Sequence, residues 1–330
     1  MNRADLRALL AARPMRLAPM AAYTNLPFRL IAVECGSGFV TNEEIDAEAL
    51  VRNRHGARTE LLMERDPAEG VVAMQLLGNR VETLVPAALE LVEAGAEIID
   101  LNMGCPVPKI VRQGKGAALM RDVASTAALL SALRAAVDVP LTIKIRGGWN
   151  DHELNAVEVA RMAQDVGVDA ITVHPRTRMM RFGGRAPWDL IADVVRAVDI
   201  PVTGNGDVTS LAEARRMMAE TGCVSVMVGR GAMGKPWIFD EAYEALDADA
   251  QATYRERVVW RHLDLIEERI PPHPALVQMK KHLGHYMAGR DNSRALRAQV
   301  FQLPDIESVR GLAREYFAEA RIPSAAGAGA

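Results

Sequence analysis

The feature that most constrains the fold of this sequence is the even spacing of its β-rich apolar runs. Successive runs are about 30 residues apart, which is the length of one βα unit. There are eight such runs, and they begin near Met15, Gly38, Val71, Glu97, Leu141, Asp169, Ile200 and Val224. Stretches with helical character separate them, among them Val81–Gly95, Ser125–Val137, Asn155–Gly167, Pro187–Val198 and Ser210–Gly222. Several of these end in glycine, as helix C-termini prefer.

This alternation predicts an α/β fold. Strands that are apolar along their whole length belong in a parallel sheet that helices cover. Eight βα units close most simply into a (β/α)8 TIM barrel, with a doubly wound open sheet as the alternative. The strand pattern stops after Phe239, and helical spacing follows. We therefore expect a barrel over residues 1–244, a small all-helical domain over 245–322 and a flexible tail over 323–330. The apolar positions of the helical domain are Val259, Leu263, Ile266 and Ile270, then Leu276, Met279, Leu283 and Met287, then Ile306, Val309, Ala313 and Phe317.

Composition narrows the class of protein. Hydrophobic residues make up 49% and charged residues 25% of the 330, which excludes a disordered chain. The three cysteines form no Cys-x-x-Cys pair, so a zinc ribbon and a redox dithiol are excluded. No run of eighteen apolar residues occurs, and the net charge of −3 gives no bulk signal for nucleic acid. We expect a cytoplasmic monomer that binds neither membrane nor DNA.

Polar residues and glycines gather where the predicted strands end, which is where barrels carry their sites. Gly204–Asp207 and Gly229–Gly231 follow the last two strands, and bare backbone N–H groups beside Arg230 suit a phosphate monoester. Tight βα turns that need glycine are the alternative. Gly229–Gly234 matches the spacing of a dinucleotide-binding fingerprint, but no parallel strand follows it, so we reject that interpretation. The same stretch with Lys235 nearly matches a P-loop, but Pro236 stands where a P-loop has the Ser or Thr that binds Mg²⁺.

Three further side chains could carry chemistry. Cys105 follows the fourth strand and could be a nucleophile, a general acid or a small buried hydrophobe. Lys144 lies within an apolar strand, where an ammonium needs either a structural ion-pair partner or an anionic cofactor. His174 ends the sixth strand and is as often structural as functional. Cys35 and Cys223 are expected in the core, and His282 and His285 lack the further ligands of a metal site.

The strand ends taken together resemble the tRNA-dihydrouridine synthase family. The matching pieces run in order from about residue 15 to 240, with a weaker echo at Lys281-His282. They are Ala18-Pro19-Met20 with Thr24 and Pro27-Phe28-Arg29, Gln75-Leu76, Asn102-Met103-Gly104-Cys105-Pro106, Lys144-Ile145-Arg146, His174-Pro175-Arg176-Thr177-Arg178, Gly204–Asp207 and Gly229–Gly231. Gly147–Trp149 resembles the B-type bacterial subgroup, whereas Tyr23, Asn25 and Pro175 depart from the family pattern.

The resemblance implies an FMN-bound barrel that reduces uridines of the tRNA D-loop with NADPH as reductant, and a helical tRNA-binding domain. Reduced flavin would deliver hydride to C6 of the uracil and Cys105 a proton to C5. A thiol with an ordinary pKa is protonated at pH 7 and can serve as that acid. The flavin ring would be held by Ala18, Pro19, Met20, Gln75 and Lys144. The ribityl phosphate would be held by His174, Asn205, Gly206, Asp207, Gly229 and Arg230.

RNA contacts are expected at two places. Residues 269–297 carry a net charge of +5. This charge has two possible explanations: a surface that binds phosphates, or an ordinary solvated helix face. The resemblance favours the first and assigns tRNA contacts to Asn102, Arg176, Arg178, Lys280, Lys281, Arg290, Arg294 and Arg297. Two other functions stay open, a flavin-dependent reductase of a free pyrimidine and a flavin-free barrel that binds phosphorylated ligands.

Overall fold

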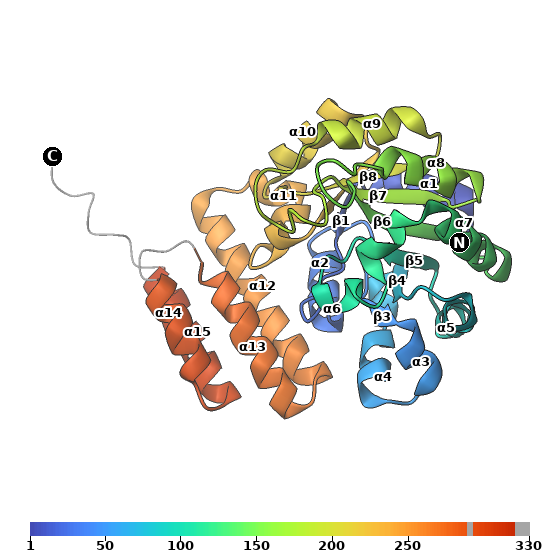
Figure 1. The fold of residues 1–330 in the computed structure, drawn as a ribbon. Coiled ribbons are helices and arrows are strands. Elements are labelled where there is room, and N and C mark those ends of the chain that lie inside the picture. Colours follow the sequence, from blue (N-terminus) through green and yellow to red (C-terminus); the bar gives the residue numbers. More distant parts are fainter. Residues whose placement is uncertain (289–292, 321–330) are drawn as a thin grey trace. The chain divides into compact units, whose positions relative to one another are not determined.

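The structure is a computed structural model, and it describes residues 1–288 and 293–320 (Figure 1). The chain divides into two compact units, Met1–Gly231 and a second one from Ala232 onward, and each is described by itself. The predicted boundary between residues 244 and 245 lies within the second unit.

The first unit contains one sheet of parallel strands. They are β1 (Met15–Leu17), β2 (Val40–Thr41), β3 (Ile45–Asp46), β4 (Val72–Leu77), β5 (Ile98–Met103), β6 (Leu141–Arg146), β7 (Ala170–His174), β8 (Val202–Asn205) and β9 (Ser225–Val228). The order is β1-β9-β8-β7-β6-β5-β4-β2, and β3 also pairs with β4. Gly38 N donates to Met15 O at 2.8 Å, which brings the two ends of this order together. The sheet is therefore a nearly closed barrel, and the predicted TIM-barrel class is confirmed. Only the short strand β3 was not expected.

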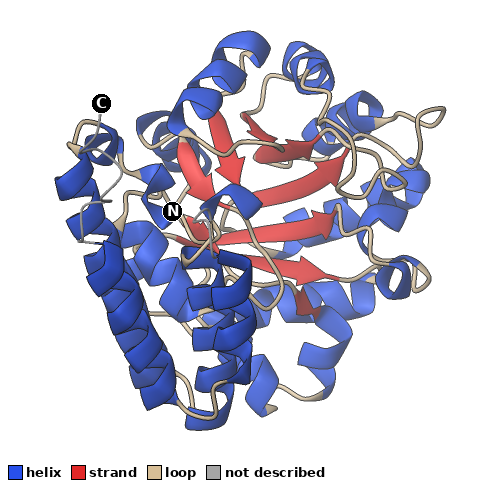
Figure 2. Cartoon of the chain, turned by 90° about the vertical axis from the view of Figure 1, so that its left-hand side faces the viewer, coloured by secondary structure: helices blue, strands red, loops and turns tan. Residues whose placement is uncertain are grey.

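Helices surround the strands of this unit (Figure 2). They are α1 (Arg3–Ala12), α2 (Leu26–Glu34), α3 (Ala47–Arg52), α4 (Ala57–Met63), α5 (Val81–Glu93), α6 (Pro108–Val111), α7 (Val123–Ala136), α8 (Ala156–Asp165), α9 (Asp189–Ala197) and α10 (Leu211–Thr221), with 3₁₀ turns η1 (Pro67–Glu69), η2 (Gly116–Arg121) and η3 (Arg230–Ala232). Helix α10 shows how the sequence sets such bounds. The Ser210 side chain caps its first turn, and Gly222 ends it with φ of +73°, a conformation that glycine adopts without strain.

The interior of the barrel contains a polar layer among apolar side chains. Arg16 donates to Thr172 Oγ1 at 2.6 Å and to Thr203 Oγ1 at 3.1 Å. Asp100 accepts from Thr142 Oγ1 at 2.5 Å and from Gln75 Nε2 at 2.7 Å. Burial lowers the pKa of Arg16 to about 10, and the Asp100 carboxylate opposes that change. Arg16 and Asp100 therefore each have hydrogen-bond partners, as buried charges require.

The second unit is helical, as the sequence predicts. It contains η4 (Pro236–Phe239), α11 (Glu241–Glu244), α12 (Ala248–Arg269), α13 (Pro272–Tyr286), α14 (Ser293–Gln302) and α15 (Ile306–Ala320). Of the twelve predicted apolar positions, Leu276 and Ile306 are partly buried and the rest are buried in one core. The expected tail lies outside the described residues. Among the helices that the structure describes, none combines the length and the apolar character needed to cross a membrane.

Candidate active site

Cys105 lies on a tight turn directly after β5. The turn is shaped by Asn102, whose Oδ1 accepts from Gly104 N at 3.1 Å and from Cys105 N at 2.9 Å. The Cys105 sulfur also accepts from the backbone N–H of Val107, and its thiol donates to the Glu44 carboxylate. Burial, and next the charge of Glu44, raise the pKa of the thiol to about 11. Cys105 is therefore a thiol at neutral pH, so it can act as an acid and is a poor nucleophile.

Lys144 lies beside this turn, on β6. Its ammonium donates to Asn205 Oδ1 at 3.0 Å, so β6 and β8 meet at this point. Asn205 is fixed in turn, because its Nδ2 donates to Met227 O at 2.7 Å. Burial, followed by the charge of Arg146, lowers the pKa of Lys144 to about 7. Its partner is a neutral amide and not a carboxylate, which leaves the ammonium suited to an anionic ligand.

His174 ends β7 in a strongly positive environment. Burial, and then the charges of Lys144, Arg146, Arg176 and Arg230, hold the pKa of His174 well below its ordinary value. Its Nδ1 is buried and has no hydrogen-bond partner in the structure. A phosphate or another anion among these four cations would supply a partner and offset their mutual repulsion.

The turns after β8 and β9 give this environment the shape of a cradle. Gly206 has φ of +125°, and a Cβ added there would lie 3.2 Å from His174 Cδ2, so only glycine leaves that space open. Gly229 comes close to the end of β1, where a Cβ would lie 3.7 Å from both Ala18 Cβ and Met20 Sδ. The structure thus brings His174, Gly206, Gly229, Ala18 and Met20 to the same end of the barrel.

Arg176 does not have the role that we expected. Its side chain is 2% exposed, and its Nη2 donates to both carboxylate oxygens of Asp207 at 2.7 and 2.8 Å. Its Nε donates to Gly183 O at 2.9 Å. The expected tRNA contact of Arg176 is corrected, because its guanidinium is buried in the loop after β7 and holds Asp207. The Asp207 carboxylate is occupied in the same way, so only its backbone could serve a phosphate.

The other predicted site residues of the barrel differ in burial and in the groups that they contact. Met20 is half-buried, and Thr24 supports its loop, because Met20 N donates to Thr24 Oγ1 at 3.0 Å. Pro19 is half-buried next to it. Gln75 is buried, and its side chain binds Asp100 and Asn102. Arg230 and half-buried Arg178 lie against aromatic rings, with Arg230 5.0 Å from the Phe182 centroid and Arg178 4.8 Å from that of Trp149.

The predicted RNA-binding residues of the second unit lie on α13 and α14. Lys280 and Lys281 are half-buried, whereas Arg294 and Arg297 are exposed. Arg290 lies outside the described residues. His282 is buried against His262, with ring centroids 4.5 Å apart, and is a core residue. Among the described residues, no cluster of three or more His, Cys, Asp or Glu side chains could hold a metal ion.

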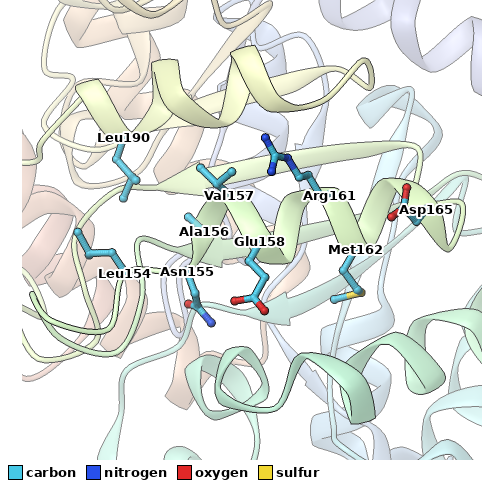
Figure 3. Close-up of a pocket in the computed structure, with 9 residues that line it drawn as sticks. All are labelled: Leu154, Asn155, Ala156, Val157, Glu158, Arg161, Met162, Asp165 and Leu190. Atoms are coloured by element: carbon cyan, nitrogen blue, oxygen red, sulfur yellow. The ribbon is translucent and has the colours of Figure 1, made fainter.

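Sequence reasoning missed Glu44 and Asp100. Glu44 contacts both Cys105 and Asn102, and Asp100 anchors Gln75 below them. A single carboxylate within an apolar strand was a signal available for Asp100, of the kind that singled out Lys144. The structure also has a separate pocket along α8 (Figure 3), which contains none of the predicted site residues; it is lined by Leu154, Asn155, Ala156, Val157, Glu158, Arg161, Met162, Asp165 and Leu190.

Fold and site together define a barrel enzyme whose strand ends carry a protonated thiol and a cluster of positive side chains around His174. The family model "Dihydrouridine synthase (Dus)" matches residues 16–320, and the chain belongs to this family. It is 36% identical over 310 residues to tRNA-dihydrouridine synthase B of Pseudomonas putida, covering 92% of this chain and 91% of the relative. It is 37% identical over 311 residues to a probable tRNA-dihydrouridine synthase of Rhodobacter capsulatus, covering 93% of this chain and 95% of the relative.

Solved structures agree on the barrel. A 2-naphthoyl-CoA reductase aligns with a TM-score of 0.56 at 12% identity, over 70% of this chain and 50% of that enzyme. Histamine dehydrogenase from Rhizobium sp. 4-9 aligns with a TM-score of 0.53 at 12% identity, over 77% and 49%. The chain thus spans about half the length of these two enzymes, and at such identities the likeness concerns the fold alone.

Proposed function

We propose that this chain reduces uridines in the D-loop of tRNA to 5,6-dihydrouridine, with FMN bound at the barrel mouth and NADPH as the reductant. Family membership gives the reaction, and the relatives named above carry the tRNA substrate in their names. The observation that carries the proposal is the pairing of a thiol whose pKa is about 11 with a cradle in which four positive side chains act on buried His174. The first suits proton donation and the second suits an anionic cofactor.

The residues fit FMN in two respects. The buried, unpartnered His174 Nδ1 and the open space at Gly206 suit the phosphate, with Arg230 at its rim. Lys144, held by Asn205, offers a half-buried ammonium for the pyrimidine edge of the ring. Bound there, the flavin would supply the hydride. Ala18, Pro19 and Met20 would border its ring. Gln75 would support the site indirectly, through its hydrogen bond with Asn102.

The protein's own part of the reaction is proton transfer and orientation. Cys105 Sγ would give its proton to C5 of the uracil, since the raised pKa keeps it protonated throughout the physiological range. Asn102 would hold the turn that carries Cys105 and would not itself need to touch the substrate, because both ends of its amide are already bonded. A uridine within folded RNA must leave its stack to reach this site.

Contacts with the rest of the tRNA would come from Arg178 and from Lys280, Lys281, Arg290, Arg294 and Arg297. Positive side chains of this kind bind the phosphate backbone without reading sequence. The three cysteines are free, as a cytoplasmic enzyme would have them, and a monomer suffices, because one barrel supplies every group named for the reaction.

The test is the visible spectrum of the anaerobically reduced protein before and after unmodified tRNA is added. Oxidised flavin bands should return with tRNA and not with free uridine. Cys105→Ala should keep the flavin and lose at least about a hundredfold in dihydrouridine formation, whereas Cys35→Ala, a core cysteine, serves as control. Reoxidation by free uridine but not by tRNA would instead favour a free-pyrimidine reductase. The absence of any flavin would refute the proposed cofactor, and normal turnover of Cys105→Ala would refute the acid.

A further inference from the structure

Glu44 is a carboxylate that the reaction described above does not use, although it touches the proposed acid. It lies between β2 and β3, and its Oε2 accepts from Asn102 Nδ2 at 2.7 Å. The Cys105 thiol donates to the same carboxylate. Two polar contacts therefore join Glu44 to the turn that carries Cys105, one to the sulfur and one to the amide that shapes the turn.

Asn102 makes this arrangement rigid because all its hydrogen-bonding positions are used. Its Nδ2 donates to Glu44 and, at 2.9 Å, to Gln75 Oε1, while its Oδ1 accepts from Gly104 N and Cys105 N. Gln75 is fixed in turn by Asp100 at 2.7 Å. Rotation of the Asn102 amide would break several bonds at once, so Glu44 and the thiol keep their relative position.

The charges around Glu44 favour one protonation state of the pair. Glu43 and Asp46, its neighbours in the chain, are negative, and Arg146 and Lys144 on β6 are the positive groups that interact with Cys105. Lys115 is engaged with Asp46 at 2.7 Å and with Glu48 at 3.5 Å. Loss of the thiol proton would place a thiolate against a carboxylate in a partly buried site, which like charges oppose. Burial raises the pKa of Glu44, and the hydrogen bond from the thiol opposes that rise.

We propose that Glu44 is a positioning residue for the acid: its carboxylate holds the Cys105 proton on sulfur and fixes the direction of the S–H bond until substrate arrives. The sulfur also accepts a hydrogen bond from the Val107 N–H, which further restricts the orientation of the thiol. The proposal about the thiol concerns the protein alone. Its catalytic consequence, an acid that stays protonated at alkaline pH, rests on the proposed function.

The experiment measures the pH dependence of Cys105 alkylation by iodoacetamide, without tRNA, in the flavin-loaded protein. Cys105→Ala identifies the signal from this cysteine. Glu44→Gln keeps an acceptor for Asn102 but removes the charge, so the alkylation midpoint should fall by about one pH unit. The rate at pH 8 should then rise about threefold, because greater thiolate content outweighs its lower nucleophilicity.

Two further variants serve as controls. Glu44→Asp keeps a carboxylate and should stay closer to the wild-type profile than Glu44→Gln. Glu60→Gln removes an exposed charge from α4 and should leave the profile unchanged. An equal shift in Glu44→Asp and Glu44→Gln, or a profile in Glu44→Gln that equals that of Glu60→Gln, would overturn the proposal.

The catalytic part is read from the pH profile of tRNA reduction. The alkaline limb of kcat should move down with the alkylation midpoint in Glu44→Gln, while KM for tRNA changes little. A merely structural role would lower kcat at every pH and leave the limb in place. If the wild-type protein failed to reduce tRNA, the proposed function would fail, and the alkylation profile would still decide on the thiol contact.

Discussion

The loop that would border the flavin depends on a buried ion pair between α2 and η1. Arg29 Nε donates to Glu69 Oε1 at 2.6 Å, and the two side chains are 1% and 0% exposed. The other nitrogens of the guanidinium donate to Thr24 O at 3.0 Å and Glu64 O at 2.6 Å. Because Thr24 supports Met20, the pair connects η1 through α2 to the loop after β1.

Glu69→Ala should cost about 3–5 kcal/mol of the free energy of unfolding, since it leaves a buried guanidinium without its counter-ion. Glu69→Gln should cost less, because it keeps an acceptor for Nε. Removal of both charges in the double variant Arg29→Met/Glu69→Leu should cost about 2 kcal/mol, which is less than Glu69→Ala alone. This remaining cost arises because Thr24 O and Glu64 O lose the hydrogen bonds that Arg29 donates to them.

Urea unfolding followed by hydrogen-exchange mass spectrometry measures these costs in the first unit separately, which a two-unit chain requires. Peptides that cover residues 15–35 should lose protection first in Glu69→Ala. A cost below about 1 kcal/mol for Glu69→Ala, or a double variant less stable than that single one, would refute the reasoning. FMN affinity should fall in Glu69→Ala and recover partly in the double variant.

Two further predictions follow from shifted pKa values. Burial lowers the pKa of Lys144 to about 7 in the free protein, so the affinity for FMN should fall as pH rises above that value. A fluorescence titration from pH 6 to 9 should show this fall in affinity in the wild type, whereas Lys144→Met should bind FMN more weakly and with little pH dependence. The same pH dependence in both proteins would contradict the prediction. Burial lowers the pKa of His262 to about 3, so the unfolded chain binds more protons between that value and about 6.5, and stability is lost as pH falls. By pH 5 the second unit should lose about 2 kcal/mol for this group in urea unfolding read from α12 and α13, and no change between pH 7 and 5 would refute the assignment.

The barrel was predictable because local and global signals coincide. Runs such as Ala170–His174 are mostly apolar up to their last residues, and glycines such as Gly222 mark where helices end, so strand order and spacing could be read without a structure. β3 could not be found in this way, because a pairing of two residues leaves no periodic pattern.

Partners that are far apart in the chain could not be found from the sequence. Arg176 looked like a nucleic-acid contact because nothing local shows that Asp207, 31 residues later, lies opposite it. Glu44 was passed over for the same reason: its importance comes from Asn102, 58 residues away, and from Cys105. Residue types at strand ends predict which groups are present, whereas the register of the strands decides which of them meet.

That register also explains how the turn that carries Cys105, the proposed acid, is fixed by strand residues. Gln75 and Asp100 are partners across β4 and β5, and Asp100 and Thr142 across β5 and β6. Asp100 holds Gln75, Gln75 holds Asn102, and Asn102 holds both the Cys105 turn and Glu44. A continuous set of hydrogen bonds therefore runs from the barrel interior to the Cys105 backbone and to Glu44, and each step begins at a strand residue. The pairing of the strands thus fixes the turn that carries the proposed acid before any ligand binds, which is the preorganisation that proton transfer to a carbon atom requires.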